Sequence, residues 1–515
     1  MKSKHLLWGL VSAFALSLSA CSSDDDSGNS SSEKAQAYMT LQLVGPQAVQ
    51  SRTQEGADGT QEGTAVENKI TKVQVLLCNA GSTTISYVYP LTGTALTETS
   101  TGAVTKPFEV QTGTYDVYVV ANPKTDLTVG QDVSNVVLSD VTMATMTSNY
   151  AADNNFMMFS QCHGTDQESG TSITITEANG YDNPATCAAI KLDRLPVKIK
   201  STLDASPDIT GVTSEAPIIT AVSLEGFKLL NGAKKTNLQQ HWSAASTSQN
   251  TNITSNPWNN VLQVPSMNGT TGTDFDYYNH ITDFRTITTT GSGIGATYTA
   301  VKDLYFNVDA YGALATSDIY CMENNPTVAG GAQAQVGNTT GLVYQIKATV
   351  TGSDGKAGEN CFYWYGTSYF ASLAALEAAY PTVFTSLGTT RTAAEGELTA
   401  AMAQSDDAQE TALSNFRVKY NIKVYKNGIM YYTYYIKDEN YVNGAAADAK
   451  PYYSVMRNTI YNLTVKALQR VGTDVPGGWN PEISSDDPVD QTKVYMVVEA
   501  KVNPWVLNNQ DITLK

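Results

Sequence analysis

The chain has 515 residues and a formal net charge of −17, from 32 lysines and arginines against 49 aspartates and glutamates. This acidic balance leaves no basic footprint for nucleic acid and disfavours docking to anionic phosphate surfaces. The length is sufficient for two or three domains, each with a sizeable core.

The first 21 residues have the order of a bacterial lipoprotein signal. Two lysines precede an apolar run over residues 6–20, and Leu-Ser-Ala stands directly before Cys21. The run is shorter than the roughly 20 residues that a bilayer-spanning helix needs. We therefore expect residues 1–21 to be an export signal with Cys21 as the lipidated residue. The alternative is an ordinary secretory signal followed by a chance cysteine.

Residues 22–32 contain no apolar side chain, so burial cannot offset the entropy lost on ordering, and we expect a flexible tether. Asp24, Asp25 and Asp26 lie within this tether. An acidic cluster in this place resembles the surface-export signal of lipoproteins in some Gram-negative anaerobes, and a solvated linker is the plain alternative.

Residues 38–44 alternate between apolar and polar side chains, which predicts a β-strand. Its apolar face consists of Met39, Leu41 and Leu43. Downstream, Arg52 is the first arginine of the chain and lies among small or polar residues. An exposed segment of this kind is accessible to a trypsin-like protease, although an ordinary loop arginine fits equally well. A cut there would make Thr53 the first residue and detach the strand.

Most of the remaining sequence consists of short strands rich in Val, Ile, Thr and Tyr, separated by Gly, Asn, Asp and Pro, as in all-β sandwiches. The clearest expected strands cover residues 70–77, 115–121, 190–201, 342–350 and 416–425. Asn427-Gly428 predicts a type I′ turn that pairs the last of these strands with residues 430–437. A turn signal just before Cys187 indicates a domain boundary there.

Two alanine-rich segments, residues 368–379 and 392–414, are expected to be helical surface insertions, because neither has a wide apolar face. Two polar segments, residues 243–255 and 268–273, are expected to be long loops.

No signature of catalysis is present: the sequence lacks a nucleophile with a base, a phosphate loop and a metal cluster at ligand spacing. We therefore expect no enzymatic activity, no metal and no cofactor. Of the six cysteines, lipidation of Cys21 leaves five, so at least one thiol stays free or pairs outside the chain.

The C-terminal end contains a second strand pattern over residues 493–502. Its apolar face consists of Val494, Met496, Val498, Ala500 and Val502, and Ile512 and Leu514 continue the pattern. A removable strand at one end and an apolar extended tail at the other suggest donor-strand assembly, in which one subunit's tail fills the groove of the next. The alternative is that both are ordinary strands within one subunit.

An ordered set of short motifs runs along nearly the whole chain. They are TGTYDVYVVAN at residues 112–122, FMM at 156–158, DRLPVKI at 193–199, YCMEN at 320–324, the Asn-Gly hairpin, RNTIYNLTV at 457–465 and NPWVL at 503–507. In this order they resemble the fimbrillins of type V pili, which are the FimA-like and Mfa-like fimbrial subunits of Gram-negative anaerobes.

The resemblance implies two transthyretin-like β-sandwich domains, residues 53–187 and 188–515, with a few short helices in the second. It implies a precursor that carries palmitate on Cys21, reaches the outer membrane, and loses the propeptide 22–52 to a surface arginine-specific protease cutting between Arg52 and Thr53. Residues 493–515 would be the donor tail. The partners would be other copies of the chain and accessory pilins, in a surface fimbrium that supports adhesion or biofilm formation.

A different class of function remains open at this stage. The chain could be a monomeric, surface-anchored lipoprotein that binds a glycan or a protein on exposed aromatic side chains. The candidates for such a platform are Trp242, Trp258, Tyr277 and Tyr278. The plain alternative is that these aromatics are packing residues or scattered surface residues.

Overall fold

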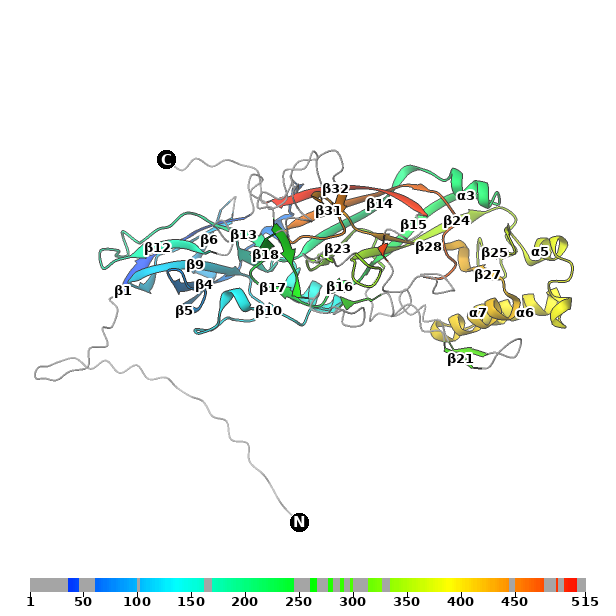
Figure 1. Ribbon diagram of the computed structural model, residues 1–515, viewed down its shortest axis with the longest axis horizontal. Coiled ribbons are helices and arrows are strands. Elements are labelled where there is room, and N and C mark those ends of the chain that lie inside the picture. The colour runs from blue at the N-terminus through cyan, green and yellow to red at the C-terminus, as the bar shows by residue number, and fades with distance from the viewer. Residues whose placement is uncertain are drawn as a thin grey trace, which may run out of the picture.

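The computed structural model is elongated, with the N-terminal strands at one end and helices α5, α6 and α7 at the other (Figure 1). It describes residues 36–45, 61–99, 102–161, 169–244, 260–265, 277–280, 288–290, 297–299, 314–326, 334–443, 450–476, 488–489 and 495–506. Within these ranges, no helix is long and apolar enough to cross a membrane. The architecture is the all-β arrangement expected, with several sheets and a few short helices.

The N-terminal part is built around a nine-stranded sheet. Eight strands follow the order β5-β4-β9-β11-β13-β2-β7-β6, and β12 also pairs with β9. The strands are β2 (Gln42–Val44), β4 (Lys72–Asn79), β5 (Ile85–Thr92), β6 (Leu96–Thr99), β7 (Gly102–Thr105), β9 (Gly113–Ala121), β11 (Met158–Ser160), β12 (Thr171–Ile175) and β13 (Ile190–Arg194). A separate pair joins β1 (Gln36–Met39) to β8 (Phe108–Gln111). The expected strands at 70–77 and 115–121 are therefore confirmed as β4 and β9.

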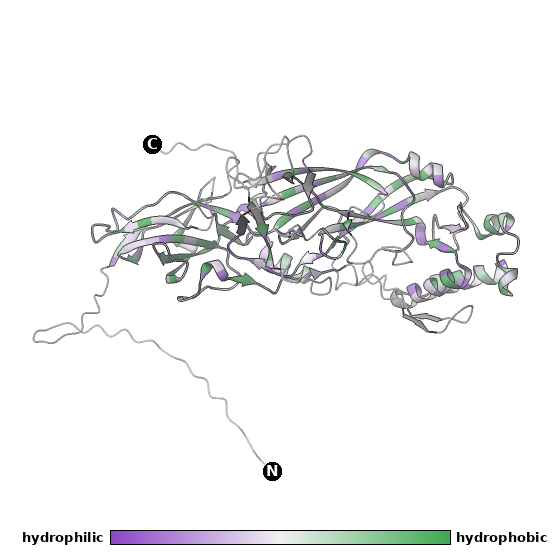
Figure 2. Ribbon diagram, in the orientation of Figure 1, coloured by the Kyte–Doolittle hydropathy of each residue, from purple (hydrophilic) through white to green (hydrophobic). Residues whose placement is uncertain are grey.

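The second part contains a five-stranded sheet with the order β23-β14-β31-β32-β3 and a three-stranded sheet with the order β15-β24-β28. The first comprises β3 (Gln61–Glu62), β14 (Val197–Asp208), β23 (Asp318–Cys321), β31 (Thr459–Leu468) and β32 (Met496–Val506); the second comprises β15 (Ile219–Leu230), β24 (Gly341–Val350) and β28 (Ile429–Tyr435). The two sheets face each other across a shared core, where the hydroxyls of Ser201 on β14 and Tyr344 on β24 lie 2.8 Å apart. Polar and apolar residues alternate along parts of β14 and β31 (Figure 2).

The segment expected to be one strand over 190–201 is in fact two strands in different sheets. β13 pairs with β11 and β2, whereas β14 pairs with β23 and β31. The chain changes sheet at Leu195 and Pro196, which separate the two strands. Proline lacks a backbone N–H and cannot continue a ladder, which accounts for the break.

The alanine-rich region forms a helical insertion with a core of its own. It contains β25 (Phe362–Tyr365), β26 (Ser368–Phe370), α5 (Leu373–Ala379), α6 (Arg391–Met402), α7 (Asp406–Tyr420) and β27 (Lys423–Tyr425). Leu376, Leu398 and Leu413 are fully buried together in this core. The first expected helix, over residues 368–379, begins with the strand β26 and is helical only from Leu373, and the second is two helices. The insertion is a small packed unit rather than a surface appendage.

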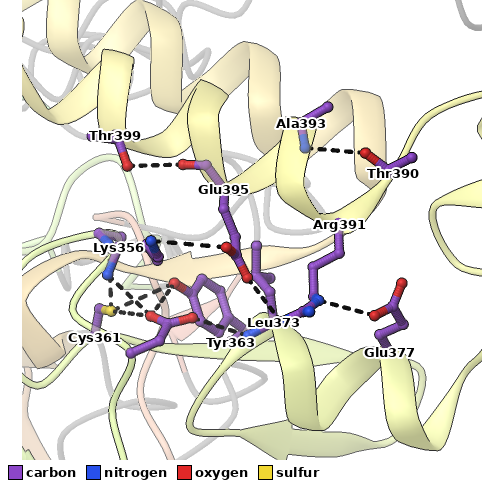
Figure 3. Close-up of polar contacts among 12 residues, drawn as sticks. Lys356, Cys361, Tyr363, Leu373, Glu377, Thr390, Arg391, Ala393, Glu395 and Thr399 are labelled. Carbon is purple, nitrogen blue, oxygen red and sulfur yellow. Dashed lines mark hydrogen bonds and ion pairs between the residues drawn. The ribbon is translucent and has the colours of Figure 1, made fainter.

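Polar contacts tie the insertion to the loop that follows β24 (Figure 3). One carboxylate oxygen of Asp354 accepts a hydrogen bond from the Tyr363 hydroxyl at 2.8 Å, and the other accepts one from the backbone N–H of Leu373 at 3.0 Å, at the start of α5. Arg391 on α6 bridges Glu377 on α5 at 2.9 Å and Glu395 at 3.1 Å. These contacts join α5 to the loop after β24 and α6 to α5.

The expected strand over 416–425 and its hairpin are wrong. Leu413, Phe416 and Tyr420 lie on one face of α7 at helical spacing and pack into the insertion core. The helix ends at Asn421, whose φ of 53° is left-handed, and only the last three residues form a strand. That strand pairs with β25, whereas β28 pairs with β24.

The remaining short elements connect these layers. They are α1 (Ala65–Asn68), α2 (Met143–Thr145), α3 (Thr210–Glu215), β10 (Val137–Leu138), β16 (Gly232–Ala233), β17 (Thr236–Asn237), β18 (His241–Ala244), β19 (Asn260–Gln263), β20 (Tyr277–Tyr278), β21 (Thr288–Thr290), β22 (Thr297–Thr299), β29 (Asp438–Asn443) and β30 (Lys450–Tyr452). The two segments expected to be long loops lie largely outside the described residues.

Candidate assembly site

The first candidate feature is the strand segment over residues 36–44, which lies inside the N-terminal part. Its inward side chains are Ala37, Met39, Leu41 and Leu43, each at most 1% exposed. The face predicted from the alternation is therefore confirmed, but the single strand expected over residues 38–44 is two strands, β1 and β2, in different sheets. β2 runs between β13, to which it is parallel, and β7, to which it is antiparallel. A strand with partners on both sides leaves a groove if it is removed.

The segment changes partner at Thr40, between β1 and β2. The Thr40 hydroxyl donates to the carbonyl of Thr105 at 2.6 Å, and the N–H of Leu41 donates to the Thr105 hydroxyl at 2.9 Å. These bonds let the chain leave β8 and continue beside β7 without orphaning its backbone groups. At Gly102, a Cβ would lie 2.2 Å from the Leu43 carbonyl oxygen, so the close approach of β7 to β2 requires glycine.

The second candidate feature is the C-terminal strand β32. Met496 and Val502 are buried, Val498 and Ala500 are half-buried, and the alternating Val497, Glu499 and Lys501 are exposed. The predicted apolar face is therefore present at these four positions. β32 pairs antiparallel with β31 of the same chain, from Met496 opposite Leu468 to Pro504 opposite Thr459.

Several predicted site residues lie outside the described residues. They are Cys21, Arg52, Thr53 and Val494. Their proposed roles in lipidation, cleavage and strand donation stay predictions.

A third feature, which the sequence alone did not reveal, lies where the two parts meet: the Trp505 cluster, made of Phe156, Arg194, Tyr320 and Trp505. The Trp505 ring is fully buried. The Arg194 guanidinium carbon lies 4.5 Å from the centre of that ring, and the Tyr320 ring stacks on the ring at 6.1 Å. The Phe156 ring meets it edge-on at 5.6 Å. The cluster joins β13, β23 and β32.

Arg194 is completely buried and has hydrogen-bond acceptors from three parts of the chain. Its Nη1 donates to the carbonyl of Trp505 at 2.9 Å and to Oδ1 of Asn458 at 3.2 Å, and its Nε donates to the carbonyl of Glu67 at 3.1 Å. Its Nη2 donates to Oδ1 of Asn68. Burial lowers the pKa of Arg194 to about 10, partly opposed by the charges of Glu67 and Asp193. The guanidinium therefore remains charged at neutral pH.

Lys198 and Glu67 form a buried ion pair beside this cluster, with Nζ 2.6 Å from Oε1. Nζ also lies 2.9 Å from a carboxylate oxygen of Asp318. Burial raises the pKa of Glu67, but hydrogen bonds from Lys198, Tyr320 and the backbone of Thr64 outweigh it, so the net pKa is lowered. Glu67 is thus held as a carboxylate.

Two other predictions can be compared with the structure. Tyr277 and Tyr278 are buried, at 2% and 7% exposed, so they do not form an exposed stacking platform. Trp258 and the side chain of Trp242 lie outside the description. Cys78, Cys187, Cys321 and Cys361 are free thiols. The described residues contain no group of His, Cys, Asp and Glu that could hold a metal ion.

The sequence contained one signal for the Trp505 cluster. Arg194 and Trp505 both belong to motifs that carried the family resemblance, at residues 193–199 and 503–507. Periodicity could not show that these motifs meet, because they are separated by 311 positions in the chain.

Comparison with known proteins matches both ends of the described chain. Residues 37–208 match the family model of the major fimbrial subunit protein FimA. Residues 423–511 match the model of the C-terminal part of fimbrillin, described as major fimbrial subunit protein type IV. A comparison with curated protein sequences gives no significant match.

Solved structures of similar proteins cover almost the whole chain at low identity. A fimbrilin (FimA) from Porphyromonas gingivalis W83 is 12% identical, with a TM-score of 0.41, and the match covers 92% of this chain and 99% of that one. The tip fimbrial protein Mfa3 from Porphyromonas gingivalis, with a C-terminal truncation, is 11% identical, with a TM-score of 0.34 and coverage of 92% and 100%. On the two family models, which together span just over half of its residues, the chain belongs to the fimbrillin family of major fimbrial subunit proteins.

Proposed function

We propose that this fimbrial subunit polymerises by exchanging strands after proteolysis. In the proposal, the precursor is exported with a lipid on Cys21 and held at the outer membrane. A surface arginine-specific protease cuts after Arg52, the segment 36–44 leaves, and the tail 493–515 of another copy enters its place.

One observation carries the proposal: the segment 36–44, which contains β1 and the inner strand β2, has a fully buried apolar face, yet it lies upstream of Arg52. Its four inward side chains are fully buried, and its second half, β2, lies between β13 and β7, whereas its first half, β1, pairs with β8. A cut after Arg52 removes the covalent link between this strand and the rest of the subunit. A sheet interior that has lost a strand exposes two unpaired edges, which another strand can pair with.

The tail matches the vacated segment in pattern. Ala37, Met39, Leu41 and Leu43 occupy alternate positions, as do Met496, Val498, Ala500 and Val502. Each set comprises three larger apolar side chains and one alanine. A strand with period-2 alternation buries one face against a sheet, so either set suits the same kind of groove.

The proposal also assigns domains. Residues 53–187 would form the first sandwich and residues 188–515 the second, and the second range would contribute β13 as an inner strand of the first sheet. Other copies of the chain and accessory pilins would be the partners, and adhesion would be a property of the polymer.

Mass spectrometry of the surface protein, combined with denaturing gels of heated and unheated samples, tests the proposal. We expect the surface protein to begin at Thr53. Unheated samples should show a ladder of oligomers, and heating should dissociate them. Replacing Arg52 by alanine should keep the lipidated N-terminus and abolish the ladder, whereas replacing Arg391, an arginine of the helical insertion, should not. An N-terminus at Cys21 in cells that display polymers would contradict the proposal.

A further inference from the structure

We infer that residues 61–68, which follow the proposed cleavage site, form a binding surface for the C-terminal end of β32 and hold the tail of an unassembled subunit in its own sheet. The inference rests on the proposed function, because it specifies what must separate before the tail can enter another subunit.

The backbone supplies the first contact. β3 pairs in parallel with the end of β32, with Gln61 opposite Trp505 and Glu62 opposite Val506. Without β3, β32 would be the edge strand of its sheet along its whole length. The Gln61 side chain adds to this contact, since its Oε1 accepts hydrogen bonds from Asn462 at 2.9 Å and from Asn503 at 3.4 Å. The end of β32 therefore has ladder partners on both sides.

Close packing supplies the second contact. A Cβ placed on Gly63 would lie 2.5 Å from Oδ1 of Asn68, 2.6 Å from Nε1 of Trp505 and 3.0 Å from Nη2 of Arg194. The backbone at Gly63 thus lies directly against the buried indole. The Tyr320 and Phe156 rings also pack against the Trp505 ring.

A chain of polar contacts supplies the third. Helix α1 presents the Glu67 carbonyl and the Asn68 side chain to Arg194, and Arg194 in turn donates to the Trp505 carbonyl. When β32 leaves, the buried guanidinium loses an acceptor and the ring on which it stacks. Burying a charged donor without its partner is unfavourable, so α1 and Arg194 favour the docked strand.

The middle of β32, residues 497–501, is less deeply buried than its Trp505 end. Val497 is 39% exposed, and Val498 and Ala500 are only half-buried, whereas Trp505 is not exposed at all. Among the described side chains of β32, Met496 and Val502 are also buried, but the large Trp505 ring is the least exposed, and its end of the strand is the part that residues 61–68 contact. Release of the tail requires this end to undock.

The same surface connects the tail to processing. Before cleavage, the chain between Val44 and Gln61 is covalently fixed at both ends, by β2 and by β3. After a cut at Arg52, β3 is connected only through Gly63 and α1. Freeing one end of a segment raises the entropy that it gains on detaching, so the cut weakens the hold of β3 on β32.

The test uses Gly63→Ala in the full chain, because the added methyl group overlaps Trp505. Gly396→Ala is the matched control, since a Cβ at Gly396 meets nothing within 4 Å. In the uncleaved monomer, hydrogen–deuterium exchange of residues 496–506 should be roughly tenfold faster in Gly63→Ala and unchanged in the control. After trypsin treatment, polymerisation should be faster by a similar factor.

Unchanged exchange of residues 496–506 in Gly63→Ala, or polymerisation no faster than that of the wild type, would overturn the inference. Gln61→Ala, which removes only side-chain bonds, provides a milder variant with the same expected direction if Gly63→Ala does not fold. A chain that lacks residues 493–515 distinguishes a failure of the proposed function from a failure of this inference. If that chain still polymerises, the proposed function fails; if it does not polymerise and Gly63→Ala shows no acceleration, only the inference fails.

Discussion

The strand over residues 36–44 allows a quantitative prediction for a chain that starts at Thr53. Met39, Leu41 and Leu43 are each at most 1% exposed. Burying an apolar side chain of this size contributes about 1.5–3 kcal/mol, so the three together contribute on the order of 5–9 kcal/mol. Domains are stabilised by about 5–15 kcal/mol in total. We therefore expect the N-terminal part of the shortened chain to be marginally folded.

Chemical denaturation of the full-length chain and of the chain 53–515 measures this difference. The N-terminal part should unfold at a much lower denaturant concentration in the shortened chain. A synthetic peptide of residues 36–44 should restore stability in proportion to the logarithm of its concentration, because it binds only the folded form. A peptide with serine at Met39, Leu41 and Leu43 is the matched control and should have no effect.

The reasoning would be refuted if the shortened chain unfolded at the same denaturant concentration as the full-length chain. It would also be refuted if the serine peptide restored stability as well as the native peptide did. In either case the groove would not depend on these side chains for its stability.

Three further predictions concern other described residues. Asn122→Ala should lower the free energy of unfolding by about 3 kcal/mol, because the fully buried Asn122 side chain bonds to the N–H of Thr71 and to two carbonyls, whereas Asn154→Ala, with a similar positive φ at the surface, should cost less. Burial raises the pKa of Cys78 to about 12, so alkylation at pH 8 should be at least about a hundredfold slower in the folded than in the unfolded chain, as read by mass spectrometry. The folded state lowers the pKa of Glu67 below 4.5, so its stabilisation is present above that pH and is lost as the pH falls through the lower folded value; melting curves of Glu67→Gln should lack this part of the acid dependence.

The sequence by itself determined the local patterns. Alternation at residues 38–44 and 493–502 identified the apolar faces of the segment that contains β1 and β2 and of β32, because side chains on a strand alternate with a period of two whatever the partner. The same local reasoning found β4, β9 and β24. It failed over residues 416–425, where tyrosines and valines typical of strands lie at the end of a helix that has its own core.

Only the tertiary structure decided which strands are neighbours. β2 lies between β13 and β7, and β3 lies against the end of β32, because hydrogen bonds join residues that are far apart in sequence. The tertiary structure also decided the role of Arg194, which the sequence shows only as an arginine in an expected strand. Its role depends on Glu67, Asn458 and Trp505, which reach it from three distant segments. Periodicity is a property of one segment, whereas a buried charge is stabilised only where the fold brings several segments together.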